Sequence, residues 1–302
     1  MPGYISFGNN GIVATQNYIA TYEGIKILEK GGNAFDAAIT VSSVLSVVLP
    51  HTGGIGGDGF IIAYIPDKVI GFNGSGKSSV NFNVEDFLKF SPLHGPLTIT
   101  VPALLKVWDW IINKFSTIDL KETLKPAIRL CFEGFNVSEE LHNAIIRRKK
   151  EFINYRNWNK LFGNLELGDR LVQKELGEVL QIISNKGIEE FYNGDLAKEI
   201  TDELVEQNVP IDVKDFENCK GFEFEPLKST YFDYDVFEIP PNSQGVSTLE
   251  MLSLIEEYLK EFKFDDFKRI EIQAKLASIV YKDRDNYVSD PDYLNFDVSK
   301  LF

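Results

Sequence analysis

The sequence contains few of the residues that hold metal ions or form disulfide frameworks. Two cysteines, Cys131 and Cys219, and three histidines occur among its 302 residues. The cysteines lie far apart and form no Cys-x-x-Cys pair, so we expect two buried or half-buried thiols rather than a disulfide framework or a metal clip. The sequence also has no His-Glu-x-x-His motif and no calcium-binding loop, so we predict no metal and no cofactor.

The three histidines do not define a catalytic centre. His51 lies at a Pro-His-Thr-Gly corner, His94 in a loop and His142 on a predicted helix. A Ser-His-Asp triad is defined by geometry rather than by sequence distance, and nothing in these spacings indicates one. We therefore expect surface or capping roles for all three side chains.

Basic residues are outnumbered, with 31 Lys and Arg against 45 Asp and Glu and a formal net charge of −14. This balance argues against binding to nucleic acid or to an anionic membrane surface. The basic run at residues 147–150 is expected on an exposed helix face. The acidic pairs Asp265-Asp266 and Asp290/Asp292 are expected at turns and helix caps rather than as a glycosidase pair.

Long hydrophobic runs are missing as well. No window reaches the roughly 18 uninterrupted apolar residues of a membrane helix, so we predict no membrane span. The N-terminal segment MPGYISFGNNGIVATQ has no basic n-region and no long apolar core, so we predict no secretory signal and expect a cytoplasmic protein. With 44% hydrophobic residues, the chain can fill the core of one large domain or of two ordinary ones.

The most informative stretch is GGNAFDAAITVSSVLSVVLPHTGGIGGDGF, residues 31–60. Its first half predicts a buried helix, because apolar and small residues surround the helix axis on nearly all sides. Asn33 or Asp36 can cap the N-terminus of this helix, and Pro50 ends it. The five glycines at positions 53–59 indicate a backbone that turns tightly or passes close to another segment.

The remaining elements follow from hydrophobic periodicity. Residues 60–65 predict a buried strand, and residues 69–72 predict its hairpin partner. Helices are expected over 16–30, 104–115, 120–132, 138–153, 173–186 and 270–284, with another that starts at Ser247. Further strands are expected over 11–15, 221–227, 229–234 and 236–239.

The segment from Gly71 to Ser78, GFNGSGKS, matches the phosphate-loop formula G-x-x-x-x-G-K-[ST] after a strand. A phosphate loop needs a helix directly after it, so that the helix N-terminus faces the phosphates. Here residues 80–84 alternate between apolar and polar side chains, and the next helix begins only near Val84. We favour a glycine-rich strand exit and keep nucleotide binding as an alternative.

In the identity and order of its residues, the stretch at residues 31–60 strongly resembles the start of the large subunit of the gamma-glutamyltranspeptidase family. In that family a GGNAxDAA helix precedes a glycine-rich turn and a GGGF-type strand. Further matching segments follow in family order, namely PAIRLCFEGF (126–135), DVKDF (212–216), PPNSQG (240–245), YKDR (281–284) and DPD (290–292). The resemblance covers nearly all of residues 9–302, and the GSG-type exit is similar to the less characterised transpeptidase-related branch.

The resemblance implies an α+β fold, the four-layer αββα sandwich of Ntn-hydrolases, with residues 1–302 as a single domain that a small subunit completes. It also implies a precursor that cuts itself ahead of a threonine. That threonine then becomes the nucleophile at the N-terminus of the small subunit, with its own amine as the base. This chain has no Thr-Thr-His segment, so we expect no catalytic residue in it, no activity and poor stability without the small subunit from the same precursor. The resemblance is also compatible with a dimer of such heterodimers.

The resemblance also points to substrate-binding residues. The family arginine that holds the α-carboxylate of a gamma-glutamyl substrate aligns with Asn73, so Asn73, Gly74 and Ser75 are the candidates. An asparagine carries no charge and cannot replace a bidentate arginine, although Lys77 offers a charge at a different offset. The implied activity is hydrolysis or transfer of gamma-glutamyl groups from glutathione-like amides. An acylase with a non-glutamyl substrate and a non-catalytic scaffold remain alternatives.

Overall fold

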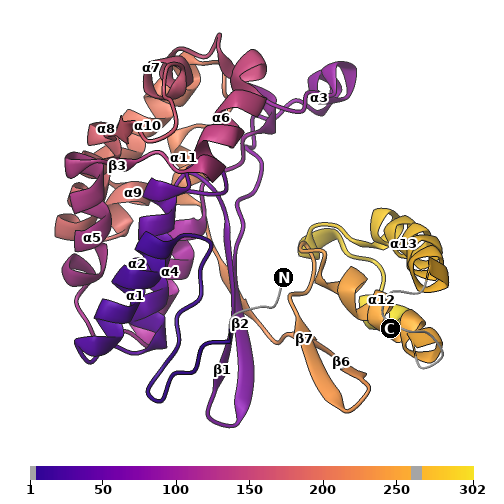
Figure 1. The fold of residues 1–302 in the computed structure, drawn as a ribbon. Coiled ribbons are helices and arrows are strands. Elements are labelled where there is room, and N and C mark those ends of the chain that lie inside the picture. The colour runs from indigo at the N-terminus through magenta and orange to yellow at the C-terminus, as the bar shows by residue number, and fades with distance from the viewer. Residues whose placement is uncertain (1–4, 260–266) are drawn as a thin grey trace. The chain divides into compact units, whose positions relative to one another are not determined.

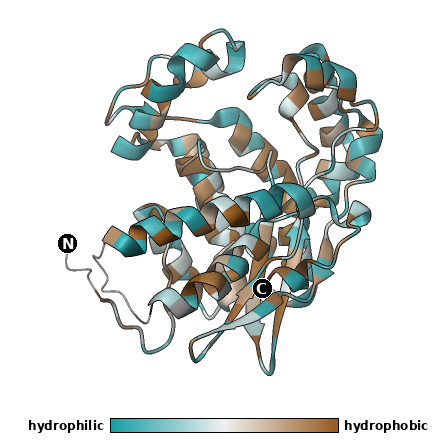
Figure 2. Ribbon diagram, turned by 90° about the vertical axis from the view of Figure 1, so that its right-hand side faces the viewer, coloured by the Kyte–Doolittle hydropathy of each residue, from teal (hydrophilic) through white to brown (hydrophobic). Residues whose placement is uncertain are grey.

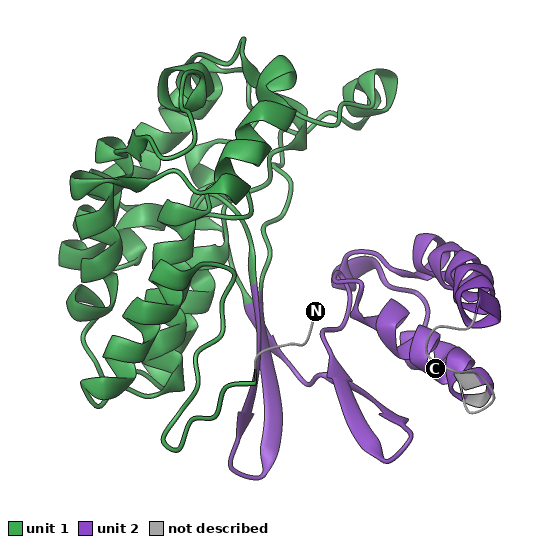
Figure 3. Cartoon of the chain, in the orientation of Figure 1, with its two compact units in different colours: residues 1–59, 74–221 green, residues 60–73, 222–302 purple. Residues whose placement is uncertain are grey.

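The computed structural model describes residues 5–259 and 267–302. The chain divides into two compact units, and each is built from separate segments (Figure 3). Unit 1 comprises Met1–Gly59 and Gly74–Gly221, and unit 2 comprises Phe60–Asn73 and Phe222–Phe302. The expectation that residues 1–302 form a single domain stays a prediction.

Unit 1 is built mainly from helices (Figure 1). Figure 2 shows brown and teal residues mixed along the helices of the chain, and an apolar face of this kind lets a helix pack against its neighbours. They are α1 (Tyr18–Glu29), α2 (Ala34–Val48), α3 (Val84–Phe90), α4 (Leu104–Lys114), α5 (Leu120–Glu133), α6 (Glu139–Phe152), α7 (Arg156–Phe162), α8 (Lys174–Lys186), α9 (Glu189–Asn193), α10 (Asp195–Glu206) and α11 (Val213–Glu217). Two short strands, β3 (Phe135–Asn136) and β4 (Arg170–Leu171), pair antiparallel.

The predicted buried helix is α2, and its capping is confirmed. The side chain of Asn33 accepts the N–H groups of Phe35 and Asp36, and the Asp36 carboxylate accepts the N–H of Asn33 in return. This reciprocal capping box satisfies donors that would otherwise be unpaired at the helix start. The helix ends at Val48, just before Pro50, as the proline predicts.

Helices α1, α4 and α5 lie beside α2 and cover it (Figure 1). Polar groups of α2 find partners across these contacts. Trp108 Nε1 donates to Ser42 Oγ at 3.0 Å, and Thr40 Oγ1 donates to the carbonyl oxygen of Thr123 at 3.1 Å. Small hydroxyl side chains thus let neighbouring helices approach α2 closely without leaving buried polar groups unpaired.

Unit 2 contains a three-stranded sheet of β1 (Gly59–Ile65), β2 (Lys68–Gly74) and β5 (Phe222–Phe224), in the order β1-β2-β5. The predicted hairpin over residues 60–72 is therefore confirmed. β2 and β5 are antiparallel, with Gly71 opposite Phe224. A Cβ atom at Gly71 would collide with the Phe224 ring, so a larger residue at this strand position would force that ring to move.

The rest of unit 2 is a hairpin of β6 (Leu227–Tyr231) and β7 (Tyr234–Glu238), followed by helices α12 (Gly245–Leu259) and α13 (Phe267–Tyr287). The 3-10 helices at Pro291–Tyr293 and Val298–Leu301 complete the described chain. Asp290 caps the first of them through its bond from the N–H of Asp292, which confirms the capping role expected there. Asp265 and Asp266 lie outside the described residues.

Several strand predictions were wrong in detail. Residues 11–15 form no strand, because no strand of the described chain pairs with them. β1 is half-exposed rather than buried, since the side chain of Tyr64 is 80% exposed. The predicted strand over 221–227 is interrupted at 225–226, and the turn between β6 and β7 falls at 232–233, where Phe232 adopts a positive φ of 50°. The predicted helices at α1, α4–α6, α8, α12 and α13 are confirmed with small shifts of their ends.

Candidate functional site

The glycine turn at residues 53–59 and the strand exit at residues 74–79 lie together in unit 1. The Asp58 carboxylate accepts the N–H of Gly76 at 2.8 Å, across 18 residues of sequence. Behind the exit, the N–H of Val101 donates to the carbonyl oxygen of Lys77 at 3.0 Å. A Cβ atom at Gly76 would overlap the carbonyl of Val101, so the exit lies directly against residue 101.

A pocket of about 240 Å³ opens beside this exit. Ser75, Lys77 and Ser78 line one part of it, and Asp215, Asn218 and Lys220 line another. A hydrogen bond connects the two parts of this lining: the Asp215 carboxylate accepts the N–H of Val80 at 3.1 Å. Hydroxyl, ammonium, carboxylate and amide groups therefore converge on one small concave surface, which is the arrangement that orients a polar small molecule.

The two cysteines, of which Cys219 lines this pocket, do not supply a nucleophile. Burial raises the pKa of the Cys219 thiol to about 11 and that of Cys131 to about 12, so both are protonated at neutral pH. Both cysteines are buried, as expected. Burial also raises the pKa of Asp58, and the hydrogen bond from Gly76 only partly opposes that effect. Asp58 therefore holds the exit in place as a hydrogen-bond acceptor.

The predicted substrate-binding residues lie in two different environments. Ser75 lines the pocket together with Lys77, and Gly74 is buried against Val107 and the carbonyl of Ala103. Asn73 is fully buried on β2 of unit 2, and its Nδ2 donates to Asn242 Oδ1 at 2.8 Å. The sequence placed Asn73 at the family's arginine position but did not predict its contact with Asn242. The Pro-Pro-Asn-Ser-Gln-Gly segment was the available signal for that contact.

The exit does not have the geometry of a phosphate loop. The N–H of Gly76, which would face a phosphate, points to the Asp58 carboxylate instead. The next helix, α3, begins at Val84 with Asn83 as its cap, well beyond the glycines. An anion in this loop would be repelled by Asp58 and would lack a helix N-terminus, so the glycine-rich strand exit is the better description.

The histidines take surface positions. His142 Nε2 lies 3.2 Å from a Glu166 carboxylate oxygen, and His51 and His94 lie at a different pocket, described below. Within the described residues, no group of three or more His, Cys, Asp or Glu side chains could hold a metal ion. No helix in that part of the chain is long and apolar enough to cross a membrane.

Comparison with solved structures identifies the class of protein. The chain matches the crystal structure of Helicobacter pylori gamma-glutamyltranspeptidase with a TM-score of 0.90 and 26% sequence identity, covering 99% of this chain and 90% of that one. This similarity establishes the α+β Ntn-hydrolase fold and confirms the fold class expected from the sequence. The gamma-glutamyltranspeptidase family model matches residues 20–302, and the chain belongs to that family.

Two curated relatives show the range of this family. The chain is 33% identical over 304 residues to the glutathione hydrolase-like YwrD proenzyme of Bacillus subtilis (strain 168), covering 97% of this chain and 58% of the relative. It is 29% identical over 314 residues to the acylase ACY 1 proenzyme of Pseudomonas sp. (strain V22), covering 97% of this chain and 56% of that relative. The chain thus spans a little over half the length of these relatives.

Proposed function

We propose that this chain is the large-subunit part of a gamma-glutamyltransferase-like enzyme that hydrolyses or transfers acyl groups of small-molecule amides. Family membership across residues 20–302 is the observation that carries this proposal. The chain covers 90% of the Helicobacter pylori crystal chain but only 58% of the YwrD proenzyme, which supports its correspondence to one subunit of a longer precursor. A cytoplasmic location and a dimer of heterodimers belong to the same proposal.

In this proposal the nucleophile is a threonine at the N-terminus of a small subunit. Its hydroxyl attacks the amide carbonyl, and its amine takes the hydroxyl proton. The amine then passes this proton to the nitrogen of the substrate amide, whose C–N bond breaks and releases the leaving amine. Water or an amino acceptor finally receives the acyl group from the acyl-enzyme. The residues described here bind and orient the substrate. The pocket at Ser75 and Lys77 is the surface that we assign to this role.

The nature of the acyl group depends on position 73. A buried, neutral Asn73 that is bonded to Asn242 offers no positive charge to an α-carboxylate. In our proposal the Lys77 ammonium, on the pocket wall beside Ser75, takes over that charge. The same neutral position favours the second candidate, an acylase with a substrate that lacks the α-carboxylate.

The processing step is tested first, on protein purified from the full native gene. Intact mass and N-terminal sequencing of every chain should show a second, smaller chain that begins with threonine. A single uncut species would overturn the proposed mechanism.

The substrate class is tested with two anilides that differ in one group. Gamma-glutamyl-p-nitroanilide carries the α-carboxylate, and 4-aminobutyryl-p-nitroanilide is the same acyl group without it. The gamma-glutamyl proposal expects at least about tenfold higher kcat/KM for the first compound, which corresponds to one charge-assisted contact. Equal values, or a preference for the second compound, would support the acylase instead.

A further inference from the structure

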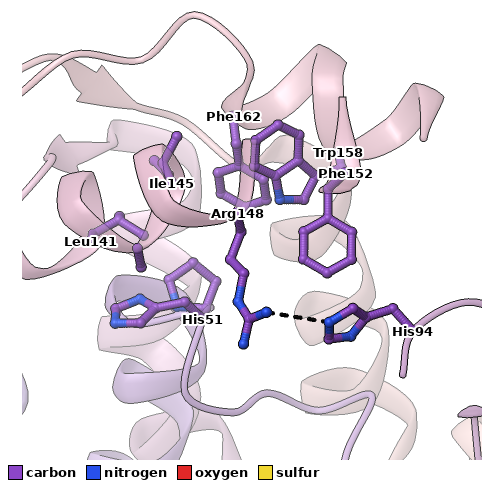
Figure 4. Close-up of a pocket in the computed structure, with 10 residues that line it drawn as sticks. His51, His94, Leu141, Ile145, Arg148, Phe152, Trp158 and Phe162 are labelled. Carbon is purple, nitrogen blue, oxygen red and sulfur yellow. Dashed lines mark hydrogen bonds between the residues drawn. The ribbon is translucent and has the colours of Figure 1, made fainter. Parts of the chain in front are cut away.

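A second pocket lies within unit 1, between α6, α7, the corner after α2 and the loop after α3 (Figure 4). Its volume is about 360 Å³. This is at the small end of the range of about 300–1,000 Å³ that is typical of ligand sites, so it suits a compact molecule. Every residue that lines it belongs to unit 1, so the site depends on one compact body.

The inner wall is apolar and aromatic. Leu141, Ile145 and Phe152 come from one face of α6, because their spacings place them on the same side of the helix. Trp158 and Phe162 come from successive turns of α7. The rings contact one another: the centroids of Phe152 and Trp158 are 6.0 Å apart, and those of Trp158 and Phe162 are 5.9 Å apart. An aromatic ring is the ligand group that such a wall accepts best.

The rim of the pocket carries nitrogen groups. Figure 4 shows the Arg148 guanidinium between the imidazoles of His51 and His94. Arg148 Nη1 lies 3.3 Å from His94 Nε2 and 2.8 Å from a Glu151 carboxylate oxygen. Glu151 does not line the pocket, and its side chain is 44% exposed to solvent. The polar side chains that face the pocket are therefore one permanent cation and two imidazoles.

We propose that this α6–α7 pocket binds a small aromatic carboxylate. The ring would lie among Phe152, Trp158 and Phe162, and the carboxylate would meet Arg148. In the described chain both contacts of Arg148 use Nη1, which leaves Nη2 and Nε for a carboxylate. An amine would face the guanidinium and be repelled, and a wholly apolar ligand would cover that charge without pairing it. This site goes beyond the proposed acyl-transfer activity and does not depend on it.

Glu151 is the natural competitor of such a ligand. It already pairs with Arg148 and lies 3.1 Å from His94 Nε2. That imidazole nitrogen can donate to Glu151 or accept from Arg148, but it cannot do both at once. A ligand carboxylate must share Arg148 with Glu151 or displace it. Removing the Glu151 charge should therefore tighten binding, a response that a purely apolar pocket would not show.

The binding test uses isothermal titration calorimetry with phenylacetate on protein purified from the full native gene. A ligand of this size with one charge-assisted contact is expected to bind with a Kd of about 0.1–1 mM. Phenylacetamide has the same shape without the charge, and acetate has the charge without the ring. Both should bind at least about tenfold more weakly than phenylacetate.

Variants locate the site. Arg148→Gln should weaken phenylacetate binding by about tenfold or more, whereas Arg147→Gln, at the adjacent exposed position of α6, should leave it unchanged. Glu151→Gln should tighten binding severalfold. Ala144→Phe should abolish it by filling the pocket that Ala144 lines.

No binding up to about 10 mM phenylacetate would overturn the proposal, including the case in which another chain of the mature protein fills the pocket. Equal affinities of the Arg148→Gln and Arg147→Gln variants would overturn it as well. If Arg148→Gln fails to fold, the opposite effects expected of Glu151→Gln and Ala144→Phe still decide the matter.

Discussion

Asn73 Nδ2 donates a hydrogen bond of 2.8 Å to Asn242 Oδ1, across 169 residues of sequence. The bond links the end of β2 to the Pro-Pro-Asn-Ser-Gln-Gly turn before α12, both within unit 2. Because Asn73 is fully buried, its amide needs such a partner. The position that the family resemblance assigns to a carboxylate-binding arginine therefore takes part in a structural contact between two segments of unit 2.

This bond predicts a measurable coupling between the two asparagines. In protein from the full gene, Asn73→Ala and Asn242→Ala should each lower the free energy of unfolding by about 1–2 kcal/mol, because each removes the hydrogen bond between the buried Asn73 amide and the exposed Asn242 side chain. A double-mutant cycle in denaturant should give a coupling of about 1 kcal/mol. Strictly additive losses would contradict the bond.

Asp36 provides a second prediction about stability. Its fully buried carboxylate accepts hydrogen bonds from the hydroxyls of Ser116 and Thr117 and from the N–H of Asn33. Asp36→Asn replaces one carboxylate oxygen by an NH2 group. That group can only donate, but the groups around it, the two hydroxyls and the N–H of Asn33, are donors as well. We expect a loss of about 2–4 kcal/mol in the free energy of unfolding, while Asp86→Asn on the exposed surface of α3 should cost almost nothing.

The same carboxylate also predicts a pH dependence. Burial by itself raises the pKa of Asp36, but the hydrogen bonds from Ser116, Thr117 and Asn33 outweigh it and leave the pKa below the usual 3.8. The stabilisation is therefore complete above that value and is lost as the pH falls through the lower pKa of the folded protein. Unfolding curves between about pH 2 and pH 6 should show a smaller acid loss in Asp36→Asn than in the unmodified protein. Parallel pH profiles would argue against this role.

Glu250 on α12 predicts a pH dependence of the opposite sign. Burial, a hydrogen bond with Asp283 and the charge of Asp283 raise the pKa of Glu250 from 4.5 to about 7. Between these values the folded protein holds a proton that the unfolded chain releases. Stability therefore falls as the pH rises through this window, and the loss is complete above about pH 7.

Glu250→Gln removes this penalty. It should raise the free energy of unfolding by about 1–3 kcal/mol at pH 8 and change it little near pH 5. Asp283→Asn, which removes the other carboxylate of the pair, should act in the same direction. Glu256→Gln on the same helix is the control, and a gain at pH 5 as large as that at pH 8 would refute the shared-proton explanation.

The proposed role of Lys77 leads to a prediction about substrate selection by the pocket at the strand exit. If its ammonium holds the substrate carboxylate, Lys77→Ala should raise KM for gamma-glutamyl-p-nitroanilide by about tenfold and leave the values for 4-aminobutyryl-p-nitroanilide unchanged. Lys89→Ala, at an exposed position of α3, is the matched control. An equal effect on both anilides would assign Lys77 a structural role.

ATP separates this role from the phosphate-loop alternative. Because Asp58 occupies the N–H of Gly76, ATP at millimolar concentration should neither raise the thermal midpoint nor compete with the anilide. ATP binding that Lys77→Ala abolishes would restore the nucleotide-binding alternative.

Local patterns explain which parts of the fold the sequence predicted well. The capping box of α2 joins Asn33 and Asp36, which are three residues apart, so both partners can be found in one short stretch. Helix periodicity likewise located α4, α5, α6 and α13. The strand expected at residues 11–15 failed, because a strand exists only when another segment pairs with it and such pairing is not local.

The candidate sites show the same limit. The glycine pattern and the family resemblance pointed to Ser75 and Lys77, and both line the pocket at the strand exit. The bond from Gly76 to Asp58 spans 18 residues, and neither partner carries a motif that names the other. The α6–α7 pocket was also not foreseen, since its histidines at positions 51 and 94 had been expected only as surface or capping residues.

By itself, the sequence determined most helices, because helix periodicity and capping residues are properties of neighbouring residues. It also determined the family and the fold class, because the family motifs and their order can be read directly from the chain. Only the tertiary structure decided that Asn73 is buried against Asn242 and that Arg148 lies between two imidazoles. Side chains that are far apart in the chain meet only after the backbone has folded. Their burial, charge pairing and pKa then depend on neighbours that no local pattern identifies.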